Sequence, residues 1–552
     1  MKFKYGMVLT FFAFLIVLGG CKTKEAGSDN ASKQVDTNDT SPVTFTFFNA
    51  EGAGKDIDTN KTKLGKMFEE ETGVNFKMEH IVGDVNTKLG VMIASGDYPD
   101  VLVPGAPDKI LEAEAFIPLN DLIDEYAPNL KKLYEPYLSQ MTDEDGNIYF
   151  IPFGAEQGYL PNPNIDQGAF WIQRAVLKEF DYPKIKTLDQ YFDLIEQYTE
   201  KYPKVDGKDT IGFTSLTDDW RFMAITNPPN HLAGYPNDGE VMVDKDTLEA
   251  KIYGNHEHTK RWLKKLNEMN SKGLFDKESF VSNYDEYLAK LTSGRVLGYF
   301  DYGWQAAQAT NALRSAGDDD KEYMALPIVF DEDIKDQYID PPAFVNNRGV
   351  GITVSAKDPV RIMKYFDLIA KEETQKLIMW GIEGETYEVD EDGRYYQTEE
   401  QLELTSNQEF REEFGFTYFE WNWPRGNGLF SDGNAWEPRR QTEVARANYS
   451  EGDKLLLDKY GVEVFADLFA EPDERPWYPA WSIELEQGTS AQIYTQRKMD
   501  LQRKHFPIMV MSSLKDFEGA WKDYTKEYSK LDVEEYEKTM TEEIKKKVES
   551  LN

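Results

Sequence analysis

Apolar and polar positions follow a regular pattern once a polar N-terminal stretch has ended. β-Branched and aromatic residues over 43–48 predict a strand, and apolar residues on one face over 61–71 predict a helix. The pattern continues with a strand over 74–81, a helix over 84–92 and a strand over 101–103. Strands that alternate with helices indicate βαβ units, so this part of the chain is predicted to build a mostly parallel sheet.

Beyond residue 153 the chain is predicted to leave this sheet and to build a second set of elements. Thr187 and Gln190 have capping-box spacing ahead of apolar residues at helical intervals, and Asp358 followed by Pro359 begins another helical pattern. The predicted elements are a strand over 296–300 and helices over 170–180, 187–201, 259–271, 284–291, 358–380 and 512–552.

The first residues carry an apolar run of a different kind. Basic residues precede an apolar run over 7–18, which ends in Leu-Gly-Gly-Cys at 18–21. This layout is typical of a signal peptide, here over 1–20, and the apolar run is too short to span a bilayer comfortably. The last four residues are similar to the bacterial lipobox, which implies a diacylglycerol on Cys21. An ordinary secretory signal followed by an unmodified cysteine is the alternative.

The segment 21–42 is rich in Ser, Asp, Asn, Thr and Lys and nearly devoid of apolar residues. Such a composition cannot bury enough surface to fold, so we expect a disordered tether between the lipid and the folded body. Cys21 is the one cysteine of the sequence, which excludes an internal disulfide. Two or more acyl chains on one residue hold a protein stably at a membrane.

Length and composition narrow the function classes. About 530 residues follow the signal peptide, too many for one hydrophobic core and enough for two large lobes or three domains. The net charge is −37, with 62 basic and 99 acidic residues, so nucleic acid and anionic lipid surfaces would be repelled. The chain also carries 31 Tyr, 32 Phe and 11 Trp, and Tyr and Trp suit wet, selective clefts as well as cores.

Several separated segments carry a family pattern. They are Phe47-Phe48-Asn49-Ala50, the run over 93–100, Asp145-Gly146-Asn147-Ile148-Tyr149, Trp171-Ile172-Gln173-Arg174, Thr187-Leu188-Asp189-Gln190-Tyr191 and Trp380-Gly381-Ile382-Glu383-Gly384. In this order they resemble the extracellular solute-binding proteins of ABC importers, specifically the large lipoprotein type associated with oligosaccharide uptake. The resemblance covers most of 43–396, whereas 407–507 carries none that is clear.

The resemblance implies an α/β fold of two lobes, similar to the type II periplasmic binding proteins, with hinge crossings and a ligand cleft between the lobes. The crossings are expected near Phe153, between 327 and 348, and near Glu383. Closure is expected to be a hinge motion driven by contacts that the ligand makes better in the closed state. The expected lobes are 43–153 plus about 345–383, and 154–344 plus 384–552.

The same resemblance implies a function and a place in the cell. The expected protein is a monomeric, non-catalytic lipoprotein at the extracytoplasmic face of the cell membrane, which captures an oligosaccharide and delivers it to the permease subunits. The partner ATPase is implied in the same way. No cofactor and no metal are expected.

A sugar presents apolar C–H faces and a rim of hydroxyls, so its site needs flat aromatic rings beside Asp, Asn, Glu and Arg. Filling a core is an equally good interpretation of any single Trp, but the Gly- and Asn-rich loop 421–436 favours a binding role. The candidate ligand-binding residues are Asn49, Glu51, Glu156, Trp220, Arg221, Asp301, Trp304, Arg348, Trp421, Trp423, Arg425 and Trp436.

The arginines of the sequence do not decide whether the sugar is neutral or acidic. Arg174, Arg348 and Arg425 could pair bidentately with a uronate carboxylate. Lone arginines are mostly surface or structural ion pairs, which is the alternative interpretation.

The acidic run 388–399 has the spacing of a calcium loop, but its first position is Glu and no entering helix is predicted. A hairpin that turns at Asp392-Gly393 is therefore favoured. Some oligosaccharide-binding relatives carry a calcium loop at the place of 203–209, which here has too few oxygen ligands. His256-Glu257-His258 lacks a third zinc ligand, and 51–55 lacks the first Gly and the final Ser or Thr of a phosphate loop.

Two other functions share the export signal and the aromatic residues. A lipid-anchored glycosidase or polysaccharide lyase would need two carboxylates about 5 to 10 Å apart, which 99 acidic residues leave open. An oligopeptide-binding lipoprotein would have a similar length and anchor. The ordered series of family segments ranks both below the sugar receptor.

Overall fold

The computed structural model describes residues 39–549, with gaps at 52–53, 159, 342, 474 and 476–479. The predicted signal peptide, Cys21 and nearly all of the predicted tether lie outside the described residues. Within the part of the chain that is described, no helix is both long and apolar enough to cross a membrane.

A six-stranded sheet forms the centre of the first lobe. Its strands are β1 (Val43–Asn49), β2 (Ile57–Asp58), β3 (Val74–His80), β4 (Val101–Val103), β5 (Phe150–Pro152) and β15 (Gly349–Ile352). They lie in the order β2-β3-β1-β4-β15-β5, and β1 runs parallel to both β3 and β4. The strands predicted over 43–48, 74–81 and 101–103 are thus confirmed, with antiparallel strands added at both edges.

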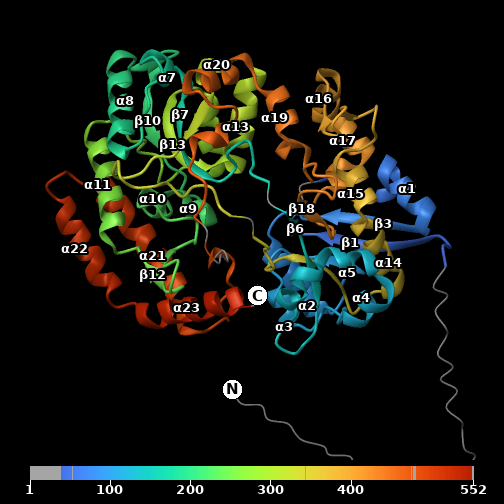
Figure 1. Cartoon of the computed structure of the whole chain (residues 1–552). Coiled ribbons are helices and arrows are strands. Elements are labelled where there is room, and N and C mark those ends of the chain that lie inside the picture. Colours follow the sequence, from blue (N-terminus) through green and yellow to red (C-terminus); the bar gives the residue numbers. More distant parts are fainter. Residues whose placement is uncertain are drawn as a thin grey trace, which may run out of the picture. The chain divides into compact units, whose positions relative to one another are not determined.

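Helices cover this sheet. They are α1 (Lys63–Thr72), α2 (Val85–Ser95), α3 (Asp108–Glu112), α4 (Asn120–Tyr126), α5 (Pro128–Tyr134), α6 (Leu138–Met141), α14 (Pro359–Ala370) and α15 (Glu372–Met379). α14 packs against α4 and α5 (Figure 1). The helix predicted over 358–380 is in fact two helices, because Lys371 has extended backbone angles between them.

A four-stranded sheet forms the centre of the second lobe. Its strands are β7 (Gly168–Gln173), β10 (Ile211–Thr214), β13 (Val296–Tyr302) and β14 (Tyr323–Leu326), in the order β10-β13-β7-β14. The helix predicted over 170–180 is wrong in its first half, which is the strand β7. Phe170 and Ile172 are fully buried in the second core, and a short run that is buried on both faces has no period that separates strand from helix.

The helices of the second lobe agree with the prediction more closely. They are α7 (Arg174–Glu179), α8 (Leu188–Lys201), α9 (Met223–Thr226), α10 (Pro228–Leu232), α11 (Glu257–Ser271), α12 (Tyr284–Thr292), α13 (Gly303–Ser315), α20 (Glu451–Tyr460), α21 (Ser490–Met511), α22 (Phe517–Tyr528) and α23 (Val533–Glu549). Thr187 and Gln190 form the predicted capping box of α8. α21 packs against α11, α22 and α23 (Figure 1).

This lobe also carries two small hairpins, β8 (Lys204–Val205) with β9 (Lys208–Asp209) and β11 (Val241–Val243) with β12 (Ala250–Ile252).

The segment after α15 belongs to the first lobe, which differs from the predicted assignment of 384–552 to the second. Its elements are β16 (Glu388–Val389), β17 (Tyr395–Tyr396), α16 (Glu399–Ser406), α17 (Gln408–Phe414), α18 (Phe416–Phe419), β18 (Gly426–Gly428) and α19 (Thr442–Asn448). Its aromatic residues lie in the same core as β1 and β3, and Trp423 packs on Phe47 at 4.9 Å between ring centroids. The last crossing lies between Val444, in the first core, and Leu456, in the second, rather than near Glu383.

Candidate ligand-binding site

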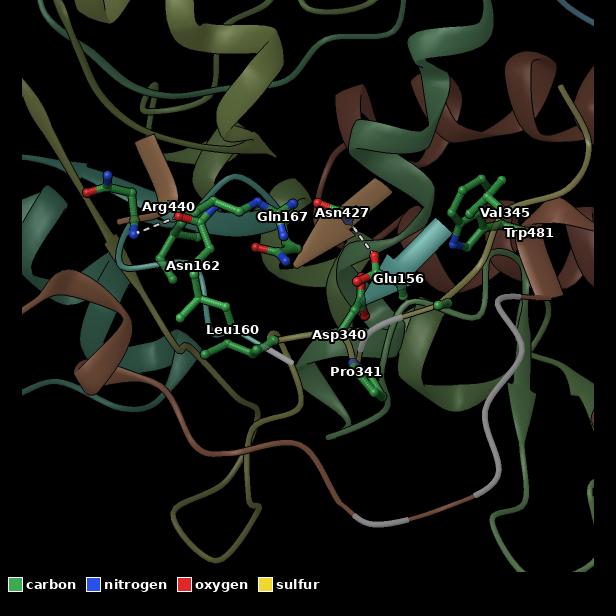
Figure 2. A pocket seen from close by; sticks show the side chains of 14 residues that line it. Glu156, Leu160, Asn162, Gln167, Asp340, Pro341, Val345, Asn427, Arg440 and Trp481 are labelled. Atoms are coloured by element: carbon green, nitrogen blue, oxygen red, sulfur yellow. Dashed lines mark hydrogen bonds between the residues drawn. The ribbon is translucent and has the colours of Figure 1, made fainter. Parts of the chain in front are cut away.

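A cavity of about 280 Å³ opens among segments of both lobes (Figure 2). The first lobe contributes the parallel strand pair β6 (Ala155–Gln157) and β18, and Arg440. The second lobe and the crossings contribute residues within 160–167 and 339–345, and Trp481. A site built from both lobes can respond to a change in their separation.

Glu156 and Asn427 form the first-lobe wall of this cavity. They are register partners in the β6 and β18 pair, so their side chains stand next to each other. Asn427 Nδ2 donates a hydrogen bond to Glu156 Oε1, as Figure 2 shows. Burial raises the pKa of Glu156 above its ordinary value, although Asn427 and nearby arginines oppose the rise.

Asp340 contributes the second carboxyl group of the lining, from the segment 339–345. The backbone N–H of Asn237 donates to Asp340 Oδ1 at 3.3 Å. Burial raises the pKa of Asp340 to about 7, and the neighbouring Asp238 acts in the same direction. The cavity therefore holds two carboxyl groups that the surrounding protein disfavours in their charged form.

Three arginines surround one buried carboxylate beside the cavity. Glu437 is only 3 % exposed and lies 2.8 Å from Arg439 Nε, 3.5 Å from Arg425 Nη1 and 3.8 Å from Arg440 Nε. Burial opposes the charge of Glu437, but the arginines outweigh it and hold its pKa below the ordinary value. Arg439 also forms an ion pair with Asp166 at 2.7 Å, which joins the segment after β18 to the segment that leads into β7.

Two of the predicted tryptophans form an exposed stack near this cavity. Trp220 and Trp304 are each half exposed, with ring centroids 6.0 Å apart and an interplanar angle of 12°. Trp304 follows Gly303, whose N–H donates to the carbonyl oxygen of Gln167 at 3.4 Å, and Gln167 lines the cavity. The guanidinium of Arg221 packs on the ring of Trp220 at 4.6 Å.

The loop after α18 contributes one more exposed ring. Trp421 is 42 % exposed, and the guanidinium of Arg425 lies 4.4 Å from the centroid of its ring. Trp481 is exposed to the same degree and lines the cavity, but the sequence analysis missed it because it lies where no family segment was recognised. Its aromatic, polar-flanked setting was the only available signal.

Trp423 and Trp436 differ from their predicted role as ligand platforms. Both are buried in the first core, Trp423 at 1 % and Trp436 at 2 % exposure. Trp423 Nε1 donates to the carbonyl oxygen of Tyr418, and Trp436 Nε1 donates to Gln375 Oε1. Their polar atoms are thus satisfied inside the protein, so these rings hold the fold rather than a ligand.

Asp301 is also built into the fold. It is fully buried, and it accepts hydrogen bonds from Tyr287 Oη at 2.9 Å and Gln305 Nε2 at 2.7 Å. Burial raises its pKa to about 7. Because its oxygens serve the junction of β13 and α13, Asp301 positions Trp304 instead of meeting a ligand.

The remaining candidates lie where β1 ends and β15 begins, outside the cavity lining. Asn49 ends β1, and its Oδ1 accepts from the N–H of Glu51 at 2.9 Å. Desolvation of the Glu51 carboxylate raises its pKa above the ordinary value, although part of the side chain is exposed. The charge of Arg348 opposes this rise. Arg174 is buried in the second lobe, in ion pairs with Asp453 and Glu322.

The acidic run 388–399 forms the favoured hairpin, with Glu388 paired to Tyr396 and Val389 to Tyr395. Asp390 Oδ1 accepts from two backbone N–H groups of the turn.

His256 caps α11, with its Nδ1 accepting from the N–H of His258 at 3.3 Å. Among the described residues, no group of three or more His, Cys, Asp or Glu side chains could hold a metal ion.

Comparison with known proteins decides the family. Residues 63–382, more than half of the chain, match the model for bacterial extracellular solute-binding proteins. The chain belongs to this family. The predicted family and the two-lobed fold are thereby confirmed.

Relatives of this solute-binding protein carry sugar-related names. The fructooligosaccharide ABC transporter substrate-binding protein FusA of Streptococcus pneumoniae is 29 % identical over 356 residues, 60 % of this chain and 62 % of that one. The chain thus spans less than two thirds of that relative. The polygalacturonan/rhamnogalacturonan-binding protein YtcQ of Bacillus subtilis is 22 % identical over 415 residues, 73 % of this chain and 77 % of that one.

The solved structure of FusA from S. pneumoniae with kestose has the same fold as this solute-binding protein. The two structures align with a TM-score of 0.64 at 19 % identity, over 91 % of this chain and 98 % of that one. These relatives are binding proteins rather than enzymes.

Proposed function

We propose that the protein is the substrate-binding lipoprotein of an ABC importer and that it captures an oligosaccharide between its lobes. It delivers this ligand to the permease subunits at the extracytoplasmic face of the cell membrane. The lipid anchor is Cys21, and the protein acts as a monomer without catalysis. The names of the related proteins support the ligand class and the transport role.

The cavity between segments of both lobes carries this proposal. Its volume of about 280 Å³ lies just below the range of about 300 to 1,000 Å³ common for small-molecule sites. Glu156, Asn427 and Asp340 offer hydrogen-bonding groups to hydroxyls, and Trp481 offers a flat apolar face. This mixture of polar groups and an aromatic ring suits a sugar.

Trp220 and Trp304 extend the proposed site beyond the cavity. Each exposed indole can cover the C–H face of one further sugar unit, and a Trp ring buries roughly 150 to 250 Å² when it is covered. Trp421 and Arg425 are the equivalent candidates on the first lobe, beside the arginines around Glu437. We place the three hinge crossings at 153–167, 327–348 and 445–455.

A ligand screen tests the proposal. Thermal unfolding of the purified mature protein is measured with fructo-, xylo-, malto- and galacturono-oligosaccharides and with short peptides. At least one oligosaccharide is expected to raise the melting temperature, because a ligand that binds the folded state stabilises it. Peptides that raise it while every glycan fails would contradict the sugar assignment.

Product analysis separates a receptor from an enzyme. The glycan that binds is incubated with the protein and then analysed by chromatography, with intact ligand as the expected result. Accumulating fragments would favour the glycosidase or lyase, for which Glu156 and Asp340 would be the first carboxyl groups to substitute. For the anchor, a Cys21→Ser variant is expected to leave the membrane fraction, and its retention there would contradict lipidation at Cys21.

A further inference from the structure

Among the described residues that line the cavity, the charged side chains are two carboxyl groups and one guanidinium, from Glu156, Asp340 and Arg440. A site for a uronic acid needs a cation whose charge is available to the ligand carboxylate, ideally an arginine in bidentate geometry. Whether the cavity accepts acidic sugars therefore depends on how far the charge of Arg440 is already neutralised.

Arg440 lies between carboxylates. Its Nε is 3.8 Å from the Glu437 carboxylate, and its charge also acts on Glu156, whose pKa it lowers. Arg425 and Arg439 share Glu437 with it, and Arg439 pairs with Asp166 as well. The arginines 425, 439 and 440 thus face the three carboxyl groups of Glu437, Asp166 and Glu156, which leaves no excess of positive charge.

Asp340 adds a further carboxyl group to the lining. The charges of Asp238 and Arg475 act on its pKa in opposite directions, and these two residues form their own buried ion pair at 2.9 Å. A carboxylate brought into the cavity would therefore be desolvated beside Glu156 and Asp340, and it would be repelled by whichever of the two is ionised. Repulsion of this kind discriminates strongly inside a protein, because water screens it poorly there.

Neutral hydroxyls match the same groups well. Asn427 engages one oxygen of Glu156, and the N–H of Asn237 engages one oxygen of Asp340. None of the described residues donates to the second oxygen of either carboxyl, so this oxygen can accept from a ligand hydroxyl. Among the described residues, Arg440 Nε has no hydrogen-bond partner, but it is buried and lies 3.8 Å from the Glu437 carboxylate, so a ligand hydroxyl would meet another part of this side chain, which lines the cavity. The lining thus offers hydrogen-bond acceptors and a donor, and a sugar hydroxyl can both donate and accept.

Arg174 and Arg348, which were suggested for a uronate, and Arg221, a further candidate binding residue, lie away from the cavity lining. Arg174 is buried with Asp453 and Glu322, and Arg348 acts on Glu51 where β1 ends and β15 begins. Arg221 packs on the rings of Trp220 and Tyr284, at 4.6 and 4.1 Å from their centroids.

We infer that this cavity selects uncharged oligosaccharides and rejects those with a uronate carboxylate at the sugar unit that enters it. The inference rests on the proposed function. It distinguishes this chain from any relative that takes an acidic polysaccharide, and it assigns the selectivity to Glu156 and Asp340.

The test compares two ligands that differ only in charge. The best-binding neutral oligosaccharide is titrated calorimetrically beside its C6-oxidised form, and triuronides are titrated beside their methyl esters. The carboxylate form is expected to bind more weakly by about tenfold or more, and the gap should persist at high salt, because salt screens buried charges poorly. A carboxylate form that binds as tightly as its neutral counterpart would overturn the inference and leave the proposed function intact.

Variants locate the selectivity. Glu156→Gln and Asp340→Asn keep the side-chain shape and are each expected to narrow the gap between neutral and charged ligands. Glu443→Gln removes the same charge at a partly exposed pair with Arg394 outside the cavity and is expected to leave the gap unchanged. A gap that none of the cavity variants changes would overturn the inference, and a protein that binds no glycan would overturn the proposed function and this inference together.

Discussion

The rings of Trp220 and Trp304 stack with their planes 12° apart, although each side chain is half exposed to solvent. The two residues come from separate segments, one from the turn after Asp218 and the other from the start of α13. Two large apolar rings held together at the surface leave flat faces in contact with water. Such a surface gains free energy when a ligand with an apolar face covers it.

Replacing Trp304 by Ala is therefore expected to weaken oligosaccharide binding by about tenfold, which corresponds to about 1.4 kcal/mol. The melting temperature should change little, because a half-exposed side chain contributes little to the core. Calorimetric titration and thermal unfolding measure the two effects. Trp304→Phe retains a ring and should recover part of the affinity, whereas unchanged binding in Trp304→Ala would remove this stack from the site.

Much of the fold follows from the sequence pattern, and the exceptions have physical reasons. Strands such as 43–48 and helices such as 187–201 were predicted from their apolar period and their caps. The strand β7 was not, because its residues are buried on both faces. The segment 384–444 was assigned to the wrong lobe, because an apolar pattern shows that a residue is buried but not in which core.

The site was predicted less completely for a related reason. Trp220 and Trp304 were chosen as aromatic rings near Asp and Arg residues, and both are exposed, Trp304 in the first turn of α13. Trp423 and Trp436 satisfied the same criterion but point into the first core, since a loop pattern does not show which side faces solvent. Trp481 lines the cavity from a segment without a recognisable family pattern.

Trp423 provides a test of whether a predicted ring packs in the core or binds the ligand. Its ring contacts Phe47 and Phe76 of the sheet, at 4.9 and 5.4 Å between centroids, and it stacks on Phe419. Trp423→Ala is expected to reduce the free energy of unfolding by about 3 to 5 kcal/mol, because it leaves a cavity in the first core. Denaturant unfolding measures the loss. A stable variant with impaired sugar binding would return Trp423 to the ligand site.

Among the charged residues next to the cavity, Glu437 is expected to cause the largest loss of stability when it is replaced. Glu437→Gln leaves Arg425, Arg439 and Arg440 without their shared buried carboxylate, and breaking such a group from one side costs about 3 to 5 kcal/mol. Thermal and denaturant unfolding measure the cost. The matched control is Glu443→Gln, whose partly exposed pair with Arg394 should contribute about 0 to 1 kcal/mol. Equal effects of the two variants would contradict the structural role of Glu437.

A carboxyl pair joins the two lobes at another place. Glu484 precedes α21 of the second lobe, and its side chain forms a hydrogen bond with Asp108 of α3 in the first lobe. Desolvation raises the pKa of Glu484 above its ordinary value of 4.5, and the bond to Asp108 and the charge of Asp108 raise it further. Lys547 opposes this rise, and Lys546 lies 3.5 Å from Glu144 of the first lobe.

This pair predicts that the contact between the lobes weakens as the pH rises. A pKa that is raised in the folded state stabilises that state fully below the ordinary value of 4.5, and the stabilisation is lost progressively as the pH rises above it. The distance between fluorophores placed on the two lobes, measured without ligand, should therefore increase with pH. In Glu484→Gln the side chain donates a hydrogen bond to Asp108 at every pH, so this increase should become smaller. A pH profile that is the same in the variant and in the unmodified protein would show that the pair does not control the separation of the lobes.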